Sequence, residues 1–489
     1  MNIRPPIPEW RLFIAMAGLY LLFPTRVYYW DGIVFAQTIE DAARLSPSLV
    51  HSNHLLYNFV GYSFYKLLLT FRPDIRALAA LQILNSVISA LCARVLYAIL
   101  TNTLRSRYFS ICLTVLFAFS ATWWKFSTDA NAYIPSILFL LISFYLVLPG
   151  RKPRPLLTAF TFFIAMALHQ LAVFMLPVLA LGIYLQDGPT TLARRGLNAF
   201  CFAAVATALI VAGYAFLFYL ATDGFDFVRL LGWTTSYSPD ADTKFGFWSN
   251  LRYSLRGLVR LFFGGRLNSL RGIWGPGIVV LVLCLIASLV SFIYNLSKNL
   301  KPVKARLETR QKTVLLLSLL WTVVYVVFLY FWLPQNTFYR LFYLPALILL
   351  LGLALASVKN VHPKTSTLGA FVIAVALANF LFLIYPSSHG EKYPPLAFAL
   401  EMNREWPPGT VIYYRNDNAD AALIRYFNPG TEWRLLLSPS PNLDSGGNAW
   451  LETTALDRMD PAWLEQHARQ ETLKEVSDRS YRIRFVQLR

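Results

Sequence analysis

The chain has 489 residues, of which 56% are hydrophobic and only 14% are charged, and its mean hydropathy is +0.48. Soluble proteins carry about 25% charged residues, so these values exclude a soluble enzyme built around one hydrophobic core. They indicate a multi-spanning membrane protein. The net charge of +18 does not indicate nucleic-acid binding, because the basic residues stand between long apolar runs and not on an amphipathic soluble surface.

The distribution of charge divides the chain into two parts. Residues 386–489 contain 12 Lys/Arg and 14 Asp/Glu, so the positive charge comes from residues 1–385, which also hold the long apolar runs. We predict a transmembrane domain over 1–385 and a small soluble α/β domain over 386–489. The 4 cysteines lie inside apolar runs without paired spacing, which indicates neither a disulfide framework nor a zinc site.

Candidate membrane spans follow from the length of the apolar runs, since a crossing helix needs about 20 residues. They are 11–27, 77–101, 108–124, 132–149, 156–186, 197–220, 276–296, 313–333, 340–357 and 366–385. No small-residue cleavage site follows the first run, so we interpret it as an uncleaved signal anchor. Two segments are ambiguous: 54–70 is apolar but contains polar residues, and 156–186 suits one tilted helix or a hairpin.

The positive-inside rule resolves both segments, because Lys and Arg in short loops mark the cytoplasmic side. If 54–70 does not cross and 156–186 is a hairpin, every basic cluster lies on one side. These clusters are Arg4 and Arg11; Arg105 and Arg107; Arg151, Lys152 and Arg154; Arg194 and Arg195; the Lys and Arg residues of 298–312; and Lys359 and Lys364. We predict about eleven crossings, with the N-terminus cytoplasmic and the C-terminal domain outside.

The hairpin over 156–186 has short arms. Each arm of about 15 residues spans about 22 Å, against a hydrocarbon core of about 30 Å. Its tip, His169-Gln170, should therefore lie below the outer surface. Polar groups at that depth are tolerated only inside protein or in a wet cavity, so we expect a cavity open to the outside.

Two acids stand out on the predicted outer side. Asp31 lies in YYWDG directly after the first span, and Asp129 is the only acid of KFSTDANAYIP, between two spans. Either acid can instead cap the N-terminus of a helix. His51 and His54 would share a helix face and suggest a metal site, but no carboxylate or cysteine stands at ligand spacing, which favours the start of an interfacial helix.

Arginines also gather on the outer side. The segment FWLPQNTFYR ends at Arg340, which either anchors the next span or contacts a phosphate. In 250–266, Arg252, Arg256 and Arg260 recur every four residues and so share one helical face. Such a helix rests on anionic lipid headgroups or forms a phosphate-facing wall beside the cavity.

Carboxylates, a recessed polar floor and arginines near the headgroups together suit sugar transfer from a lipid-linked phosphosugar. The departing phosphate requires positive charge, and the acceptor hydroxyl must lose its proton to a carboxylate. The lipid tail needs a groove between helices. Our candidate substrate-binding residues are His54, Lys125, His169, Gln170, Arg256, Arg260, Asn336, Tyr339 and Arg340.

The order of these features resembles that of a known family. Asp31 follows the first span, Asp129 follows the third, a polar hairpin tip comes next, and Pro334, Asn336 and Arg340 precede a span with Leu344-Pro345. This layout resembles the GT-C superfamily of integral membrane glycosyltransferases, in the branch of protein O-mannosyltransferases and lipid A aminoarabinose transferases.

The resemblance implies a mainly α, GT-C-like helical bundle over most of 1–385. It also implies an inverting transferase that uses a polyprenyl-phosphate sugar, with Asp31 as general base and Asp129 as a second site acid. Several members carry adjacent acids in the first loop, whereas Gly32 follows Asp31 here. That departure argues against a divalent metal, so we expect no cofactor.

The C-terminal domain is predicted as strand 410–415, helix 418–427, strand 433–437, two helices within 446–470 and a last strand 480–488. It contains no Gly-rich phosphate loop and no nucleophile motif. It either recognises the acceptor or stabilises the protein by packing.

Two other functions remain open. A transporter or lipid flippase typically has internal repeats, broken helices and midplane charges; we find no repeat and almost no midplane charge. A non-catalytic assembly protein of the envelope would leave Asp31 and Asp129 without a role. We expect a bacterial plasma-membrane protein whose partners are the lipid-linked donor, membrane lipids and a protein, glycan or lipid acceptor.

Overall fold

A computed structural model describes residues 9–186, 191–222, 224–236, 246–265, 276–299, 307–357, 365–389, 393–416, 418–436, 448–478 and 481–488. Contacts divide the chain into two compact units. Unit 1 comprises Met1–Pro24 and Thr38–Pro386, and unit 2 comprises Thr25–Gln37 and Ser387–Arg489. Residues 25–37 therefore go with the C-terminal part of the chain, which the charge pattern did not indicate.

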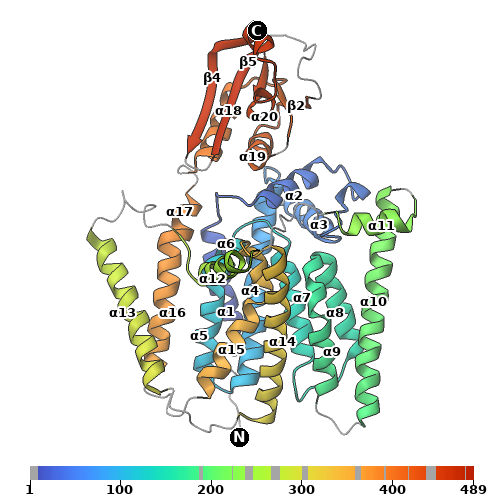
Figure 1. Cartoon of the computed structure of the whole chain (residues 1–489), viewed down its shortest axis with the longest axis vertical. Helices are drawn as coiled ribbons and strands as arrows, with labels where there is room; N and C mark the ends of the chain where they lie inside the picture. Colours follow the sequence, from blue (N-terminus) through green and yellow to red (C-terminus); the bar gives the residue numbers. More distant parts are fainter. Residues whose placement is uncertain are drawn as a thin grey trace. The chain divides into compact units, whose positions relative to one another are not determined.

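Unit 1 is built mainly from long helices whose axes lie roughly along one common direction (Figure 1). The longer ones are α1 (Glu9–Leu22), α4 (Ala77–Leu104), α5 (Arg107–Ala118), α7 (Tyr133–Leu146), α8 (Pro155–Leu168), α9 (Leu176–Leu185), α10 (Leu192–Thr222), α13 (Pro276–Asn299), α14 (Thr309–Trp332), α15 (Leu344–Ala356) and α16 (Thr365–Asn379). Between them lie η1 (Pro47–Leu49), α3 (Tyr57–Leu69), α6 (Ala121–Ser127), η2 (Gln170–Met175), α11 (Phe227–Thr234), α12 (Phe247–Phe262), η4 (Phe338–Phe342) and η6 (Phe380–Ile384). Helix α2 (Trp30–Asp41) begins in unit 2, and α17 (Tyr385–Ser388) ends there.

The expected bundle of apolar helices is confirmed. Among the described residues, α4, α10, α14 and Thr367–Ser388 are long and apolar enough to cross a membrane, and α5 with α6 makes a fifth if that bent pair is one span. Six further apolar helices have 10–17 residues. The predicted number of crossings stays a prediction. Lys359, Lys364 and residues 300–306 of the predicted basic loop lie outside the described residues.

Two predicted spans are interrupted. The 108–124 segment bends by 66° between α5 and α6. The 156–186 segment leaves its α-helix at His169, whose backbone is extended, and resumes as η2 and α9. The first interruption places the polar segment after α6 next to α4, which also contacts α1, α3, α5 and α7. Helix α4 thus lies at the centre of these helices and supports that polar segment.

Unit 2 contains a five-stranded sheet in the order β2-β1-β3-β5-β4. Its strands are β1 (Val411–Tyr414), β2 (Glu432–Leu435), β3 (Ala449–Glu452), β4 (Ala468–Asp478) and β5 (Tyr481–Leu488), and its helices are α18 (Pro394–Glu405), α19 (Ala419–Phe427), α20 (Thr453–Leu456) and α21 (Pro461–His467). Strand β1 pairs in parallel with β2 and β3, whereas β5 is antiparallel to β3 and β4.

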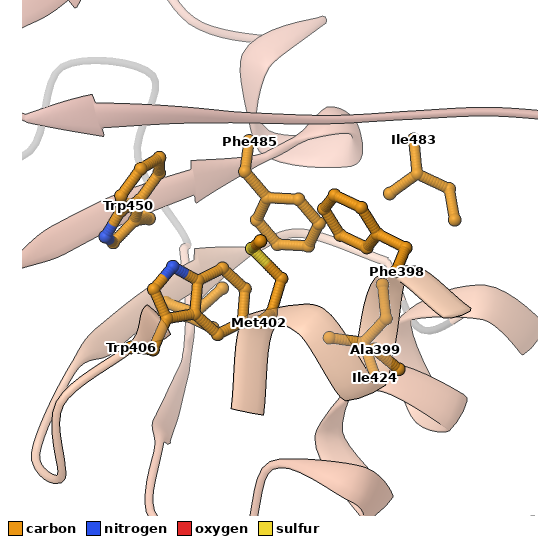
Figure 2. Packing of buried hydrophobic residues seen from close by; sticks show 9 residues of the cluster. Phe398, Ala399, Met402, Trp406, Ile424, Trp450, Ile483 and Phe485 are labelled. Carbon is orange, nitrogen blue, oxygen red and sulfur yellow. The ribbon is translucent and has the colours of Figure 1, made fainter. Parts of the chain in front are cut away.

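Alternation along the strands gives this sheet two buried faces. One face carries Ile412, Trp450 and Phe485 and packs against Phe398 and Met402 of α18 (Figure 2). The opposite face buries a second cluster, which consists of Tyr413, Leu436, Ala449, Leu451, Ala455, Met459 and Leu488. The small α/β domain predicted from the sequence is therefore present.

Two helices, α20 and α21, lie within 446–470 as predicted, but the strands at the two ends of this range were not predicted. Residues 449–452 form the central strand β3, and β4 begins at Ala468. Four residues are too few for an alternating pattern to be recognised. Strand β4 has the mostly polar sequence ARQETLKEVSD and is defined by its antiparallel pairing with β5, which a local pattern does not reveal.

Candidate active site

A buried loop between α6 and α7 carries Asp129, which is 0% exposed. Three side chains of α4 hold the backbone of this loop. Gln82 donates to the carbonyl oxygen of Thr128 at 3.0 Å, and Ser86 donates to that of Ser127 at 3.1 Å. Asn85 donates from Nδ2 to the carbonyl oxygens of Asp129 and Asn131, both at 2.8 Å. Because these donors satisfy buried carbonyls, the loop keeps one conformation.

Asp129 is not the cap of the next helix. Its Oδ1 accepts a hydrogen bond from the backbone N–H of Ala130 at 2.9 Å. The neighbouring Asn131 instead accepts from the N–H of Ile134, in the first turn of α7, at 3.2 Å. The N-cap position of α7 is Ala132, without a side-chain cap, so Asp129 does not occupy that position.

Tyr57, at the start of α3, borders this loop. Burial raises the pKa of Tyr57, and the negative charge of Asp129 raises it further, so the phenol stays protonated. Its segment is joined to the hairpin tip by two backbone hydrogen bonds, from Leu56 to Ala167 at 2.9 Å and from Gln170 to Asn53 at 3.1 Å. Asp129 and the hairpin tip thus belong to one local structure.

Two predicted residues, His54 and His169, contact each other at the hairpin tip. Their ring centroids are 4.7 Å apart, and both side chains are buried. The ring of His51 stacks on that of His54 at 5.0 Å. Nδ1 of His54 lies 3.2 Å from the carbonyl oxygen of Leu168, so we assign a proton to that nitrogen. Burial lowers the pKa of His54, and the neighbouring His169 and His51 lower it further.

The remaining residues of this group surround His169. Its ring contacts Tyr133 at 4.8 Å and Phe342 at 5.0 Å, and that of Tyr339 lies 6.1 Å away. Tyr339 also stacks on Trp332 at 5.3 Å. The late outer segment predicted from sequence is therefore packed against the hairpin tip. Gln170 leaves this group, since its Nε2 donates to the carbonyl oxygen of Thr234 at 3.1 Å.

Arg340 is only 2% exposed. Its Nη1 donates to the hydroxyl of Tyr343 at 2.9 Å, and its Nη2 donates to the carbonyl oxygen of Pro334 at 2.6 Å. Its Nε has no hydrogen-bond partner, and no carboxylate of the described residues lies within ion-pair distance of Arg340. A buried cation without an opposite charge is costly and is therefore a marker of an anion-binding site.

The other predicted binding residues lie at more exposed positions. Lys125 is half-buried in the last turn of α6, and Asn336 is half-buried, with no partner for its Oδ1. Arg256 and Arg260 are exposed on α12. The contacts of these four residues do not distinguish substrate binding from a structural role.

Asp31 belongs to unit 2 and is described there. It is half-buried in the first turn of α2, where the helix dipole favours a carboxylate. The capping alternative is thus correct in placing Asp31 at the start of a helix, but Asp31 lies inside that helix and not before it. Within the same unit, Tyr28 stacks on Phe427 at 5.8 Å, and Gln37 accepts a hydrogen bond from Nε of Arg425 at 3.3 Å. Unit 2 therefore holds the segment that carries Asp31.

Sequence reasoning missed Gln82, Asn85 and Ser86. A signal was present, because these polar residues recur at i, i+3 and i+4 in an otherwise apolar span and so share one helix face. It also missed Tyr57 and Tyr133. In the described part of the chain, no group of three or more His, Cys, Asp or Glu residues is placed to hold a metal ion.

Comparison with known proteins identifies the fold. No family profile and no curated protein sequence matches the chain. The structure of ArnT from Cupriavidus metallidurans bound to undecaprenyl phosphate matches with a TM-score of 0.62 and 11% identity, over 98% of this chain and 97% of that one. The apo structure of the same protein gives a TM-score of 0.59 and 12% identity, with the same coverage.

An oligosaccharyltransferase from Archaeoglobus fulgidus, solved with zinc and sulfate, gives a TM-score of 0.42 and 12% identity, over 86% of this chain and 62% of that one. The two ArnT structures confirm the GT-C-like fold that the sequence predicted, with an ArnT-like arrangement and a small C-terminal sheet domain. With its apolar helices, this fold identifies an integral membrane protein.

Proposed function

We propose that this protein is a glycosyltransferase that moves a sugar from a polyprenyl-phosphate donor to an extracytoplasmic acceptor. The single observation that carries the proposal is the buried guanidinium of Arg340, which has no carboxylate partner among the described residues and packs in the same segment as Tyr339. The shared fold supports the choice of donor, because ArnT was solved with undecaprenyl phosphate.

In the proposed reaction the acceptor oxygen attacks the anomeric carbon of the sugar, and the bond from that carbon to the phosphate oxygen breaks. The polyprenyl phosphate leaves with its negative charge facing Arg340, which stabilises that charge as it develops. The configuration at the anomeric carbon inverts, because one displacement occurs. The proposed reaction includes no metal ion, because charge-assisted hydrogen bonds from Arg340 offset the negative charge that develops on the leaving phosphate.

The acceptor proton goes to a carboxylate. We assign this role to Asp31, with Asp129 as a second site acid that lies beside Tyr57 and the hairpin tip. His54, His169, Gln170, Lys125, Asn336, Arg256 and Arg260 are proposed to contact the donor or the acceptor. The protein is proposed to lie in a bacterial plasma membrane with its N-terminus cytoplasmic and unit 2 outside.

The decisive experiment measures sugar transfer by purified protein in detergent from a polyprenyl-phosphate sugar. Asp31→Asn is expected to lower kcat by about 10²–10⁴-fold, the usual contribution of a general base. Asp74→Asn is the matched control, because Asp74 is exposed and pairs with Arg72. Unchanged product formation by Asp31→Asn at equal protein level would refute the base assignment.

The same assay separates the transporter alternative. The 66° bend between α5 and α6 makes either a broken span, of the kind that transporters use, or a re-entrant loop, so this alternative has one observation in its favour. A transporter moves its substrate between two compartments and forms no new glycosidic bond. Transfer in detergent, where no compartments exist, therefore excludes a pure transporter or flippase.

A further inference from the structure

Both ends of helix α12 are hydrogen-bonded to other helices of unit 1. Near its start, Nδ2 of Asn250 donates to the carbonyl oxygen of Tyr330 at 2.9 Å, and the hydroxyl of Tyr330 donates to the carbonyl oxygen of Phe247 at 3.0 Å. Near its end, Asn379 donates to the carbonyl oxygen of Phe262 at 2.8 Å. Figure 1 views this helix nearly along its axis while the long helices stand upright, so α12 runs across the bundle.

Only one stripe of α12 is buried. Its buried residues are Asn250, Gly257 and Leu261, which fall on one face because they are seven and four residues apart. Most of the rest of the helix is exposed, including Trp248 at 76% and Val259 at 60%. The helix therefore meets the protein through a narrow contact, with Gly257 in its middle.

Gly257 lies directly against Arg340. A Cβ added at this glycine would be 2.6 Å from Nη2 and 2.7 Å from Cζ of Arg340, with Nε also inside contact distance. The guanidinium cannot simply move aside, because Tyr343 and Pro334 accept hydrogen bonds from its Nη atoms. The backbone of α12 thus occupies the Nε side of the group.

We propose that Gly257 is a positioning residue, through which α12 fixes the guanidinium of Arg340 for the phosphate of the lipid donor. This inference rests on the proposed function. A guanidinium has five N–H donors, one on Nε and two on each Nη. Gly257 covers the edge of the guanidinium formed by Nε and Nη2, and the hydrogen bonds to Tyr343 and Pro334 each use one Nη N–H. One N–H remains on each Nη, and we assign these two donors to the phosphate.

The test compares Gly257→Ala with Gly232→Ala in α11, where an added Cβ meets nothing within 4 Å. In a helix, Gly→Ala is favourable by about 0.8–1.0 kcal/mol of intrinsic propensity, so a loss at Gly257 does not come from a weaker helix. We expect Gly257→Ala to raise KM for the donor about tenfold or more, with KM for the acceptor unchanged. Gly232→Ala should resemble wild type. Equal donor KM values in both variants overturn the inference.

A double-mutant cycle with Arg340→Lys distinguishes the two proposals. Lysine lacks Nε and the planar fork, so Gly257→Ala should raise donor KM much less in the Arg340→Lys background than in wild type. Additive effects overturn the positioning role. If Arg340→Lys and Arg340→Ala both keep the wild-type donor KM, the assigned role of Arg340 in the proposed function fails instead.

Folding yield gives a second readout. Suppose that Gly257→Ala alone does not accumulate in membranes. The proposed contact then requires that Gly257→Ala/Arg340→Lys accumulates, because the ammonium group of lysine is smaller than a guanidinium and does not clash with the added Cβ. If Gly257→Ala/Arg340→Lys accumulates in membranes to a lower level than Arg340→Lys alone, the inference is overturned.

Discussion

The side-chain amide of Asn85 donates a hydrogen bond to the carbonyl oxygen of Asp129 at 2.8 Å. The same amide nitrogen also binds the carbonyl oxygen of Asn131. One side chain of the central helix α4 therefore fixes the backbone on both sides of Ala130. Because Asp129 is buried, its carboxylate position depends on this backbone.

Asn85→Ala removes the side-chain donor of the buried carbonyl of Asn131, at a cost of about 1–3 kcal/mol when that group is unsatisfied, whereas the carbonyl of Asp129 keeps Nδ2 of Asn131 as a donor at 3.2 Å. We expect a lower melting temperature and a fall in transfer of about tenfold or more, since the Asp129 loop loses its fixed conformation. Asn102→Ala is the control on the same helix, because Nδ2 of the exposed Asn102 binds only a carbonyl of its own turn, that of Ala98. Matching losses in the two variants would contradict this assignment.

Acid should destabilise unit 1 through His51. Burial lowers the pKa of His51 to about 4, from an ordinary value of 6.5. The unfolded chain therefore takes up a proton between these two values while the folded chain does not. Stability contributed by neutral His51 is complete above pH 6.5, declines as the pH falls towards 4, and declines no further below that value.

The measurement is thermal unfolding of the detergent-solubilised protein between pH 7.5, about one unit above the ordinary pKa of 6.5, and pH 4.5, which lies near the lower end of this window. His51→Gln should reduce the decline in melting temperature. His389→Gln, at an exposed position, serves as the control and should follow wild type. An undiminished acid decline in His51→Gln would show that His51 is not responsible.

Unit 2 should depend strongly on Phe485, which is 0% exposed. Its ring lies 5.2 Å from that of Trp406 and 5.7 Å from that of Phe398, so Phe485→Ala opens a cavity between the sheet and α18 (Figure 2). We expect a loss of about 3–5 kcal/mol of stability. Leu435→Ala, at a side chain that is 54% exposed, should lose little.

Limited proteolysis of the full chain measures this effect, as cleavage within 387–489. Transfer activity should fall with the same temperature dependence, because the Asp31 segment belongs to unit 2. Full activity in a Phe485→Ala protein whose unit 2 is cleaved would argue against any catalytic role for that segment.

The sequence allowed the helical bundle and the break of the 156–186 segment to be predicted because each is a local signal, whereas the recess of the hairpin tip and the outer position of the acids stay predictions. Asp129 and His169 are polar groups between apolar runs, and such groups need a protein environment wherever the chain goes. The contact between His54 and His169 was not predicted, although both residues were named as binding candidates. Strand β3 escaped prediction because its neighbours in the sheet come from distant parts of the chain.

Gly257 escaped prediction for a related reason. Nothing near it in the sequence distinguishes it from Gly232, and only the approach of Arg340 from another element shows why a side chain is excluded there. The boundary of unit 2 is similar, since the contacts of residues 25–37 are made with residues nearly the whole chain away. Short-range patterns contain no information on such pairs.

Unit 2 combines an early segment of the chain with its last hundred residues, so its packing can be completed only late in synthesis. Tyr28 stacks on Phe427, and Gln37 binds Arg425, so the segment with Asp31 leaves the ribosome hundreds of residues before its partners. Chains emerge from the ribosome at about 5–20 residues per second, and early domains ordinarily fold first. Here the segment must wait, incompletely packed, while the helices of unit 1 are inserted. A chain that stops before α19 would therefore carry Asp31 without the contacts that hold its segment in place.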